Sequence, residues 1–587
     1  MHPDCRFRQA VLAAALLFVT LSPALADDRP ATELLPDSTV LYAEMPRPAK
    51  LLGTILDHPL RSKIEALDAY EEAVGTDEFA EFQTVLGVIE AQIGMSWREA
   101  VEAVTENGIT VAVDAESEGL AIIVDARDEE SLRRVLETLM EIARSDARSK
   151  GNEDPYREKD YRGLTVYETK NGGFAVIGRK LVICNKKELG KYILDSHLDG
   201  GVETLAASAR FQEARPGPDA EPTAWGYVDI GFLRDAGAAQ DLFKGRADNP
   251  VGELLLGGLL EALQDTPFAT ASLDIAEEGV TLAFSMPHDP AGVSEAREYW
   301  FGPEATGTAN PLPEDAANLF ALTTYRDLSQ FWLRAGDLFD ENILDGFAEA
   351  DSNLTTLFSG RDFGEEILGA FSPQVQFIAR RQEFGETGPR PAIRLPAFAL
   401  VFEMRDPETT QGEMRRIFQS LIGFLNVVGA MNGQPQLELG MQQDNDVELV
   451  TASYLPEAGE EDADDARINF NFAPSVGFAG KRFIVSSTSG LARQLSGSGD
   501  EDDRAAAATQ ANTAARLDVG ELRTVLGENR SHLIAQNMLE NGHTREEAEA
   551  EIGALEAIAG YFDDLSLQLV TAGERIELVL GLRLNVE

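Results

Sequence analysis

Cysteine is nearly absent from this sequence: Cys5 and Cys184 are the two cysteines among 587 residues. Cys5 precedes an N-terminal apolar run that we expect to be removed, so Cys184 would stand alone and could form no intramolecular disulfide. It ends the apolar run LVIC at 181–184, which favours a small buried strand residue over a catalytic nucleophile. We therefore expect a fold that is held together by its hydrophobic core.

Histidine is also scarce, and its spacing predicts no metal site. No HxH, HExxH or HxxxH pair brings two imidazoles to one metal ion. The motifs GxxxxGK[ST], GxGxxG and GxSxG are missing as well, which removes the sequence support for phosphate-binding loops and common serine hydrolases. We therefore predict no catalytic, cofactor-binding or metal-binding residues. Beyond His2, the isolated histidines are His58, His197, His288, His532 and His543.

Positive charge is in short supply. The chain has 50 Lys and Arg against 100 Asp and Glu, a net charge of −50, and 11 of the basic residues are lysines. So acidic a surface repels phosphate backbones, and we expect no nucleic-acid partner. It also repels itself, which suggests a saline medium whose counter-ions reduce that repulsion. The hydrophobic share of 44% is nevertheless ordinary for a globular protein, and the length predicts several domains.

Residues 1–26 have the layout of a secretory signal peptide. Arg6 and Arg8 come first, an apolar run of 12 residues follows at 10–21, and small residues precede a cleavage site after Ala26. Twelve residues are fewer than the roughly 20 that span a bilayer, although an uncleaved anchor is the alternative. No later segment reaches 18 uninterrupted apolar residues. We expect an exported protein, periplasmic or extracellular, with no transmembrane segment after signal removal.

The sequence resembles itself. Residues 35–43 (LPDSTVLYA) return with one added residue as 312–321 (LPEDAANLFA), and residues 121–128 (AIIVDARD) return as 399–406 (ALVFEMRD). After residues 121–128, and again after residues 399–406, apolar residues follow the i, i+3, i+4, i+7 spacing of an amphipathic helix. Asp128 and Asp406 are the predicted N-caps of these helices.

Further paired segments keep the same order. Residues 178–183 correspond to 480–485, and residues 227–234 correspond to 516–523. We therefore predict an internal duplication.

Its two tandem modules are expected at 27–290 and 312–587, joined by a Pro/Gly-rich connector at 291–311. Strand pairs with short polar turns and interspersed helices predict an α+β fold with antiparallel sheets, and a doubly wound nucleotide-binding sheet is disfavoured. A cleft between the modules would be the first place to look for a ligand.

Three other features suggest surfaces or sites. The acidic runs at 460–465 and 500–503 favour solvated loops over Ca²⁺ sites. A basic cluster could dock on an acidic face of the other module or bind a small anion. The apolar run at 421–431 favours a centrally buried helix, and lining an apolar ligand groove is the alternative. The basic cluster consists of Arg380, Arg381, Arg390 and Arg394.

Several local segments carry a resemblance to a known group. These are LPDS at 35–38 with HPL at 58–60, GRDFG at 360–364, LPAFALV at 395–401 and NGQP at 432–435. With them, the chain resembles a family of exported proteins typical of Planctomycetes-type bacteria, known as a domain of unknown function. The resemblance implies export and a duplicated architecture over nearly the whole mature chain. It implies no reaction, cofactor or active-site residue.

These observations support three functional hypotheses. The leading one is an exported, non-enzymatic binding or structural protein of the cell envelope, because two large modules carry no recognisable catalytic motif. The second is a carrier of an apolar small molecule between the two modules. The third is a hydrolase that uses paired carboxylates, since any two of 100 acidic residues could meet in space. A protein partner or an apolar small molecule is the expected kind of ligand.

Overall fold

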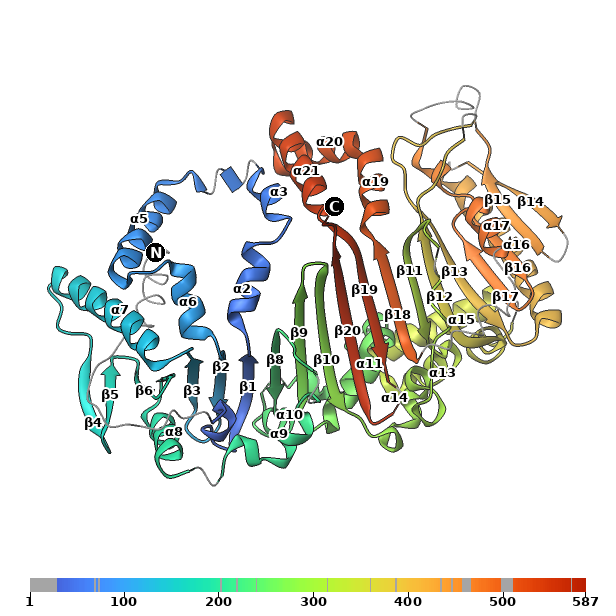
Figure 1. The fold of residues 1–587 in the computed structure, drawn as a ribbon. Helices are drawn as coiled ribbons and strands as arrows, with labels where there is room; N and C mark the ends of the chain where they lie inside the picture. Colours follow the sequence, from blue (N-terminus) through green and yellow to red (C-terminus); the bar gives the residue numbers. More distant parts are fainter. Residues whose placement is uncertain are drawn as a thin grey trace. The chain divides into compact units, whose positions relative to one another are not determined.

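The chain divides into two compact units, shown as a ribbon in a computed structural model (Figure 1). Among the described residues, the first unit contains residues up to Ala236 together with Pro267–Phe284. The second unit contains Gly237–Thr266 and Ser285–Asn585. The structure describes residues 29–586 except for 68–69, 72–73, 201–202, 218–219, 239, 314, 359, 386–387, 433–434, 445–446, 457–465, 498–509 and 572. The predicted signal peptide and both acidic runs lie outside the described residues.

The first unit is built on an antiparallel sheet with the strand order β4-β5-β6-β7-β3-β2-β1-β8-β9. A hairpin connects β9 to β10. The strands are β1 (Thr39–Met45), β2 (Gly108–Asp114), β3 (Gly119–Asp125), β4 (Arg157–Tyr161), β5 (Leu164–Thr169), β6 (Gly172–Ile177), β7 (Lys180–Cys184), β8 (Ala224–Val228), β9 (Ala269–Ala276) and β10 (Gly279–Pro287).

Helices cover both faces of this sheet, and the side chains of β7 alternate between the two hydrophobic cores that these helices form with it. Leu181 and Ile183 belong to the core beneath α7, whereas Val182 and Cys184 belong to the core beneath α8, as the alternation of side chains along a strand requires. The helices of the unit are α2 (Pro48–Leu56), α3 (Arg61–Glu65), α5 (Asp77–Ile93), α6 (Trp97–Thr105), α7 (Glu129–Ser149), α8 (Lys187–Asp199), α9 (Ala209–Ala214) and α10 (Ile230–Asp235).

The second unit contains a sheet with the strand order β14-β15-β16-β17-β13-β12-β11-β18-β19-β20, again antiparallel throughout. The strands are β11 (Asn318–Tyr325), β12 (Phe371–Arg380), β13 (Ala397–Met404), β14 (Leu437–Asp444), β15 (Val447–Tyr454), β16 (Ser475–Ala479), β17 (Arg482–Ser486), β18 (Ala511–Asp518), β19 (Phe562–Val570) and β20 (Arg575–Leu584).

The helices of the second unit also lie on both faces of its sheet. The core beneath α16 contains Met414, Phe418 and Ile422, and the core beneath α17 contains Leu491 and Leu495. The helices are α11 (Pro250–Asp265), α12 (Glu298–Phe301), α13 (Leu328–Leu333), α14 (Ala335–Leu338), α15 (Glu341–Leu357), α16 (Pro407–Met431), α17 (Ser489–Gly497), α19 (Val519–Glu528), α20 (Arg530–Asn541) and α21 (Arg545–Ala559). No helix among the described residues is long and apolar enough to cross a membrane.

The two predicted helix caps differ. The Asp128 carboxylate accepts a hydrogen bond from the Ser131 backbone N–H at 2.7 Å, as a capping residue of α7 should. Asp406 occupies the same position before α16 but makes no capping bond; its carboxylate accepts from the Thr409 hydroxyl instead. The prediction is therefore confirmed for Asp128 and wrong for the side chain of Asp406.

Aromatic packing places residues 237–266 and 285–311 in the second unit. Trp300 of α12 is fully buried against Gly258 of α11, where a Cβ would lie 2.1 Å from the indole ring. The Arg326 guanidinium lies over the same ring, 4.4 Å from its centroid. The expected module boundaries at 290 and 312 were inferred from the repeat in the sequence. The division by packing is a different one and does not test the repeat, so these boundaries stay a prediction.

The expected α+β fold with antiparallel sheets is confirmed. Strands β1 to β9 occupy the same places in the first sheet as β11 to β19 occupy in the second. Helices α7 and α16 follow equivalent strands, as do α8 and α17. Descent of the two units from one duplicated gene stays a proposal.

Candidate ligand-binding pocket

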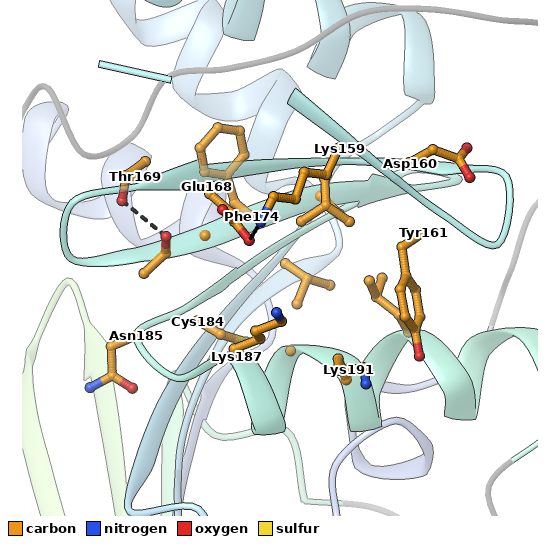
Figure 2. A pocket seen from close by; sticks show the side chains of 17 residues that line it. Lys159, Asp160, Tyr161, Glu168, Thr169, Phe174, Cys184, Asn185, Lys187 and Lys191 are labelled. Carbon is orange, nitrogen blue, oxygen red and sulfur yellow. Dashed lines mark hydrogen bonds and ion pairs between the residues drawn. The ribbon is translucent and has the colours of Figure 1, made fainter. Parts of the chain in front are cut away.

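The first unit contains a cavity of about 530 Å³ between its outer strands and α8 (Figure 2). Strands β4 to β7 form one wall and α8 forms the other. At one end, Tyr161 donates a hydrogen bond of 2.9 Å to the Asp195 carboxylate, and Arg162 reaches the same carboxylate at 2.8 Å. These contacts fasten the β4–β5 hairpin to α8. The size lies within the range of small-molecule pockets.

The floor of this pocket is apolar. Val166, Ala175 and Val182 contribute to it from the strands, together with Cys184 and Leu194. All five belong to or pack against the core on the α8 face of the sheet. The floor therefore offers a surface that favours the hydrocarbon part of a ligand over water.

Two glycines shape the floor in different ways. A Cβ at Gly172 would lie 2.2 Å from the carbonyl oxygen of Cys184, and the φ of Gly172 is +150°, so a larger residue there would displace the strand. A Cβ at Gly190 would meet Cys184 Cβ at 3.7 Å, which is ordinary contact. Gly190 can therefore accept a side chain that fills the pocket.

Lysines line the rim. Lys159 extends from β4 and forms an ion pair with Glu168. Lys187 and Lys191 stand four residues apart on α8, and Figure 2 shows them on the helix, across the cavity from Lys159. Lys191 lies 5.7 Å from the centroid of the Tyr161 ring. In the described part of the chain, Lys187 has no ion-pair partner.

The lysines control the charge of the pocket. The hydrogen bond from Lys159 lowers the pKa of Glu168, and the positive charges of Lys159 and Lys187 lower it further. Lys186, the N-cap of α8, supplies no side-chain acceptor to the first turn. The backbone N–H groups of that turn therefore add to the attraction for an anion beside Lys187.

The sequence held a signal for this site that motif searches missed. Seven of the 11 lysines fall within residues 150–191, a segment with ten basic and six acidic residues and a net charge of +4. The whole chain carries −50. Such a local reversal marks a candidate anion site even without a motif. The seven are Lys150, Lys159, Lys170, Lys180, Lys186, Lys187 and Lys191.

The Cys184 thiol in the floor of the pocket is a poor nucleophile. Cys184 is 5% exposed in β7, which confirms the expected buried strand residue. Burial raises the pKa of its thiol to about 12, so the thiol is neutral near pH 7. A nucleophilic role would require the opposite shift.

A second cavity, of about 230 Å³, lies between α16 and the sheet of the second unit. Its lining includes Phe371, Phe402 and Phe418 and contains no charged residue. Of the apolar run at 421–431, Leu421 lines this cavity and Ile422 is buried. The expected central burial of the whole run is wrong, because five of its side chains are exposed: Phe424, Leu425, Val427, Val428 and Met431.

The basic cluster serves the interior of the second unit. Arg380 forms an ion pair with Asp315, and Arg381 forms ion pairs with Glu521 and Glu528. These carboxylates belong to the same unit, which gives no support to the expected docking role.

The histidines and acidic residues give no metal centre within the described ranges. His58 acts in a turn, where its Nδ1 accepts a hydrogen bond from the Leu60 N–H at 3.1 Å. His288 stacks on Phe301 with 4.9 Å between ring centroids. Among described residues, no group of three or more His, Cys, Asp or Glu side chains is arranged to hold a metal ion.

Comparisons with known proteins identify no family. No family model matches the chain, and no curated protein matches it. Crystal forms I, III and IV of TP0453 are similar to it at 8%, 10% and 9% identity, with TM-scores of 0.26, 0.24 and 0.23. They cover 50%, 46% and 44% of this chain and 90%, 84% and 79% of their own. Similarity at this level carries no inference about function.

Proposed function

We propose that this chain is an exported, non-enzymatic binding protein of the cell envelope. Its ligand is an amphipathic anion, held in the lysine-lined pocket of the first unit. One observation carries the proposal: an apolar floor meets Lys187 and Lys191, within the one lysine-rich segment of a chain that carries −50.

The electrostatics favour an anion inside the pocket despite the acidic chain. At physiological salt the Debye length is about 8 Å, so distant carboxylates are largely screened while the rim lysines are not. Three lysines and two acids line the cavity, Asp160 and Glu168 being the acids, and Lys159 already neutralises Glu168. Lys187 and Lys191 are the positive charges left for a ligand.

The floor selects the apolar part of the ligand. Each CH₂ group that leaves water contributes about 0.8 kcal/mol. A medium-length acyl chain would therefore supply a substantial part of the binding free energy, and the lysines would fix the orientation of its acidic head. A carboxylate and a phosphate monoester are both suitable heads.

Three probes with one tail test this ligand class. We would titrate the mature chain calorimetrically with dodecanoate, dodecanol and dodecyltrimethylammonium. The anion should bind about tenfold or more tightly than the alcohol, and the cation should bind least. Equal affinity for all three heads, or no binding at all, contradicts the proposal.

Variants locate the site. Gly190→Leu should abolish binding of the probes, because the new side chain fills the pocket above its floor. The double variant Lys187→Gln with Lys191→Gln should weaken the binding of dodecanoate and leave the binding of dodecanol unchanged. Lys244→Gln is the matched control, because Lys244 is an exposed lysine of the second unit paired with Asp241. Loss of dodecanoate binding in the control would show that overall charge, and not the pocket, governs affinity.

The second cavity favours the carrier of an apolar molecule as a second candidate function. It lies inside the second unit, whereas the sequence suggested a place between the modules. A neutral aromatic probe such as naphthalene should bind there and be excluded by Leu421→Trp. Organic extraction of the purified protein followed by mass spectrometry would identify a retained molecule. The carboxylate-dependent hydrolase stays a prediction.

Export and shared ancestry are parts of the proposal with their own support. The signal-like segment 1–26 supports export, and N-terminal sequencing of the mature protein should begin at Asp27. The common strand order of the two sheets supports descent from one duplicated gene. Membership of the planctomycete-type family rests on the sequence segments alone.

A further inference from the structure

The two sheets end in equivalent edge strands with opposite chemistry. Among the described strands, β4 pairs with β5 alone, and β14 pairs with β15 alone. The β4 sequence REKDY carries four charges in five residues, a common protection of a free edge. In β14, with the sequence LELGMQQD, Leu439 to Gln443 carry no charge. Leu439 and Met441 are 43% and 58% exposed.

The backbone of β14 offers hydrogen-bonding groups at this edge. The Leu437 N–H donates to Asn426 Oδ1 at 2.7 Å, and Asn426 Nδ2 donates to the Leu437 carbonyl at 2.8 Å. Both groups of Leu437 therefore point away from β15. Because backbone direction alternates along a strand, the N–H and C=O groups of Leu439 and Met441 point the same way. In the described structure they have no strand to pair with.

The helix segment beside this edge is free of charge, whereas β14 itself contains Glu438 and Arg493 donates a hydrogen bond to the Gln442 side chain. Residues 417–437 contain no Asp, Glu, Lys or Arg, although 26% of the whole chain is charged. Within this segment, Phe424, Val427 and Met431 of α16 are 56%, 62% and 82% exposed. A second copy of this acidic chain would meet strong repulsion over much of its surface, but not here.

We propose that β14 pairs antiparallel with β14 of a second copy of this chain, centred on Gly440. In that register Leu439 lies opposite Met441 of the second copy and exchanges two hydrogen bonds with it, and the symmetric pair does the same. Glu438 lies opposite Gln442, so no two carboxylates face each other across the strands. The same surface serves both copies, as a two-fold interface requires.

Sedimentation of the mature full chain tests the association. The wild type should form dimers as its concentration rises to about 100 µM in about 0.5 M NaCl, where the Debye length is near 4 Å. Met441→Lys should leave a monomer even though it lowers the net negative charge. Leu539→Lys is the matched control, because it makes the same charge change at a side chain that is 85% exposed on α20. It should still dimerise.

Cross-linking tests the register. Gly440 of the two copies would form a non-hydrogen-bonded pair with Cα atoms about 4.5 Å apart, close enough for a disulfide. A Cβ at Gly440 meets the movable Thr451 hydroxyl at 2.9 Å. Gly440→Cys should oxidise to a covalent dimer, whereas Gln442→Cys, opposite Glu438, should not. A monomeric wild type, a dimeric Met441→Lys or equal cross-linking of the two cysteine variants overturns the proposal. A monomer that binds lipid vesicles or an extended peptide through this edge also overturns it.

Discussion

Alkylation of Cys184 provides a direct measure of the pocket floor. Burial moves the pKa of this thiol from 9.0 to about 12. Three pKa units correspond to a thousandfold smaller thiolate fraction, and the thiolate is the species that reacts. At pH 8, iodoacetamide should therefore modify the folded mature chain about a thousandfold more slowly than the chain in urea. Mass spectrometry over time measures both rates, because Cys184 is the only thiol left once residues 1–26 are removed.

The pH dependence of the alkylation rate distinguishes a raised thiol pKa from steric shielding of the thiol. In the folded chain the rate should rise about tenfold per pH unit up to about pH 12, whereas in urea it should level off above pH 9. A raised folded-state pKa stabilises the fold below pH 9, and this contribution is lost as the pH rises through 12. Between pH 8 and 10 wild type should lose about 1.4 kcal/mol relative to Cys184→Ala. A folded chain that reacts as fast as the unfolded one at pH 8 would refute the reasoning.

Three further predictions concern stability. Trp300→Ala should lower the free energy of unfolding by about 3–5 kcal/mol in urea titrations, whereas the more exposed Trp97→Ala should cost far less. Asp128→Ala should cost about 1 kcal/mol because it removes a helix cap, and Asp406→Ala should cost less because that carboxylate caps nothing; comparable losses would contradict this. The melting temperature should rise between low salt and about 0.5 M NaCl, since salt screens the excess of carboxylates, and a flat profile would remove the basis for a saline habitat.

Local periodicity predicted much of the fold. The apolar stripe of α7 was readable because its buried residues Leu132, Leu136 and Met140 follow the helical repeat, and Asp128 stands at its start. The uninterrupted apolar run LVIC at 181–184 likewise predicted a buried strand residue, and in the structure its alternate side chains enter the cores on the two faces of the sheet. In both cases the signal lies within one element, so no knowledge of distant contacts was needed.

Features that depend on contacts between distant residues could not be predicted from the sequence. The second half of α16 is apolar all round, which predicted burial, yet Val427 and Met431 are exposed because the sheet beneath the helix covers one side only. The pocket combines residues from five elements, so no spacing rule could reveal it. The lysine concentration at 150–191 was the one available clue.

The two units also show how one strand order can lead to different sites. Lys191 on α8 corresponds to Arg493 on α17, because both lie eleven residues after the start of β7 and β17, respectively. Lys191 lines an open pocket, whereas Arg493 is held by a 2.8 Å hydrogen bond to Gln442 of β14. The cavity of the second unit lies instead on the opposite, α16 face of its sheet. An Arg493 variant that cannot reach Gln442 would show whether this hydrogen bond alone keeps the second unit from binding dodecanoate. We expect no gain in dodecanoate binding, because α17 supplies only this one cation where α8 supplies two.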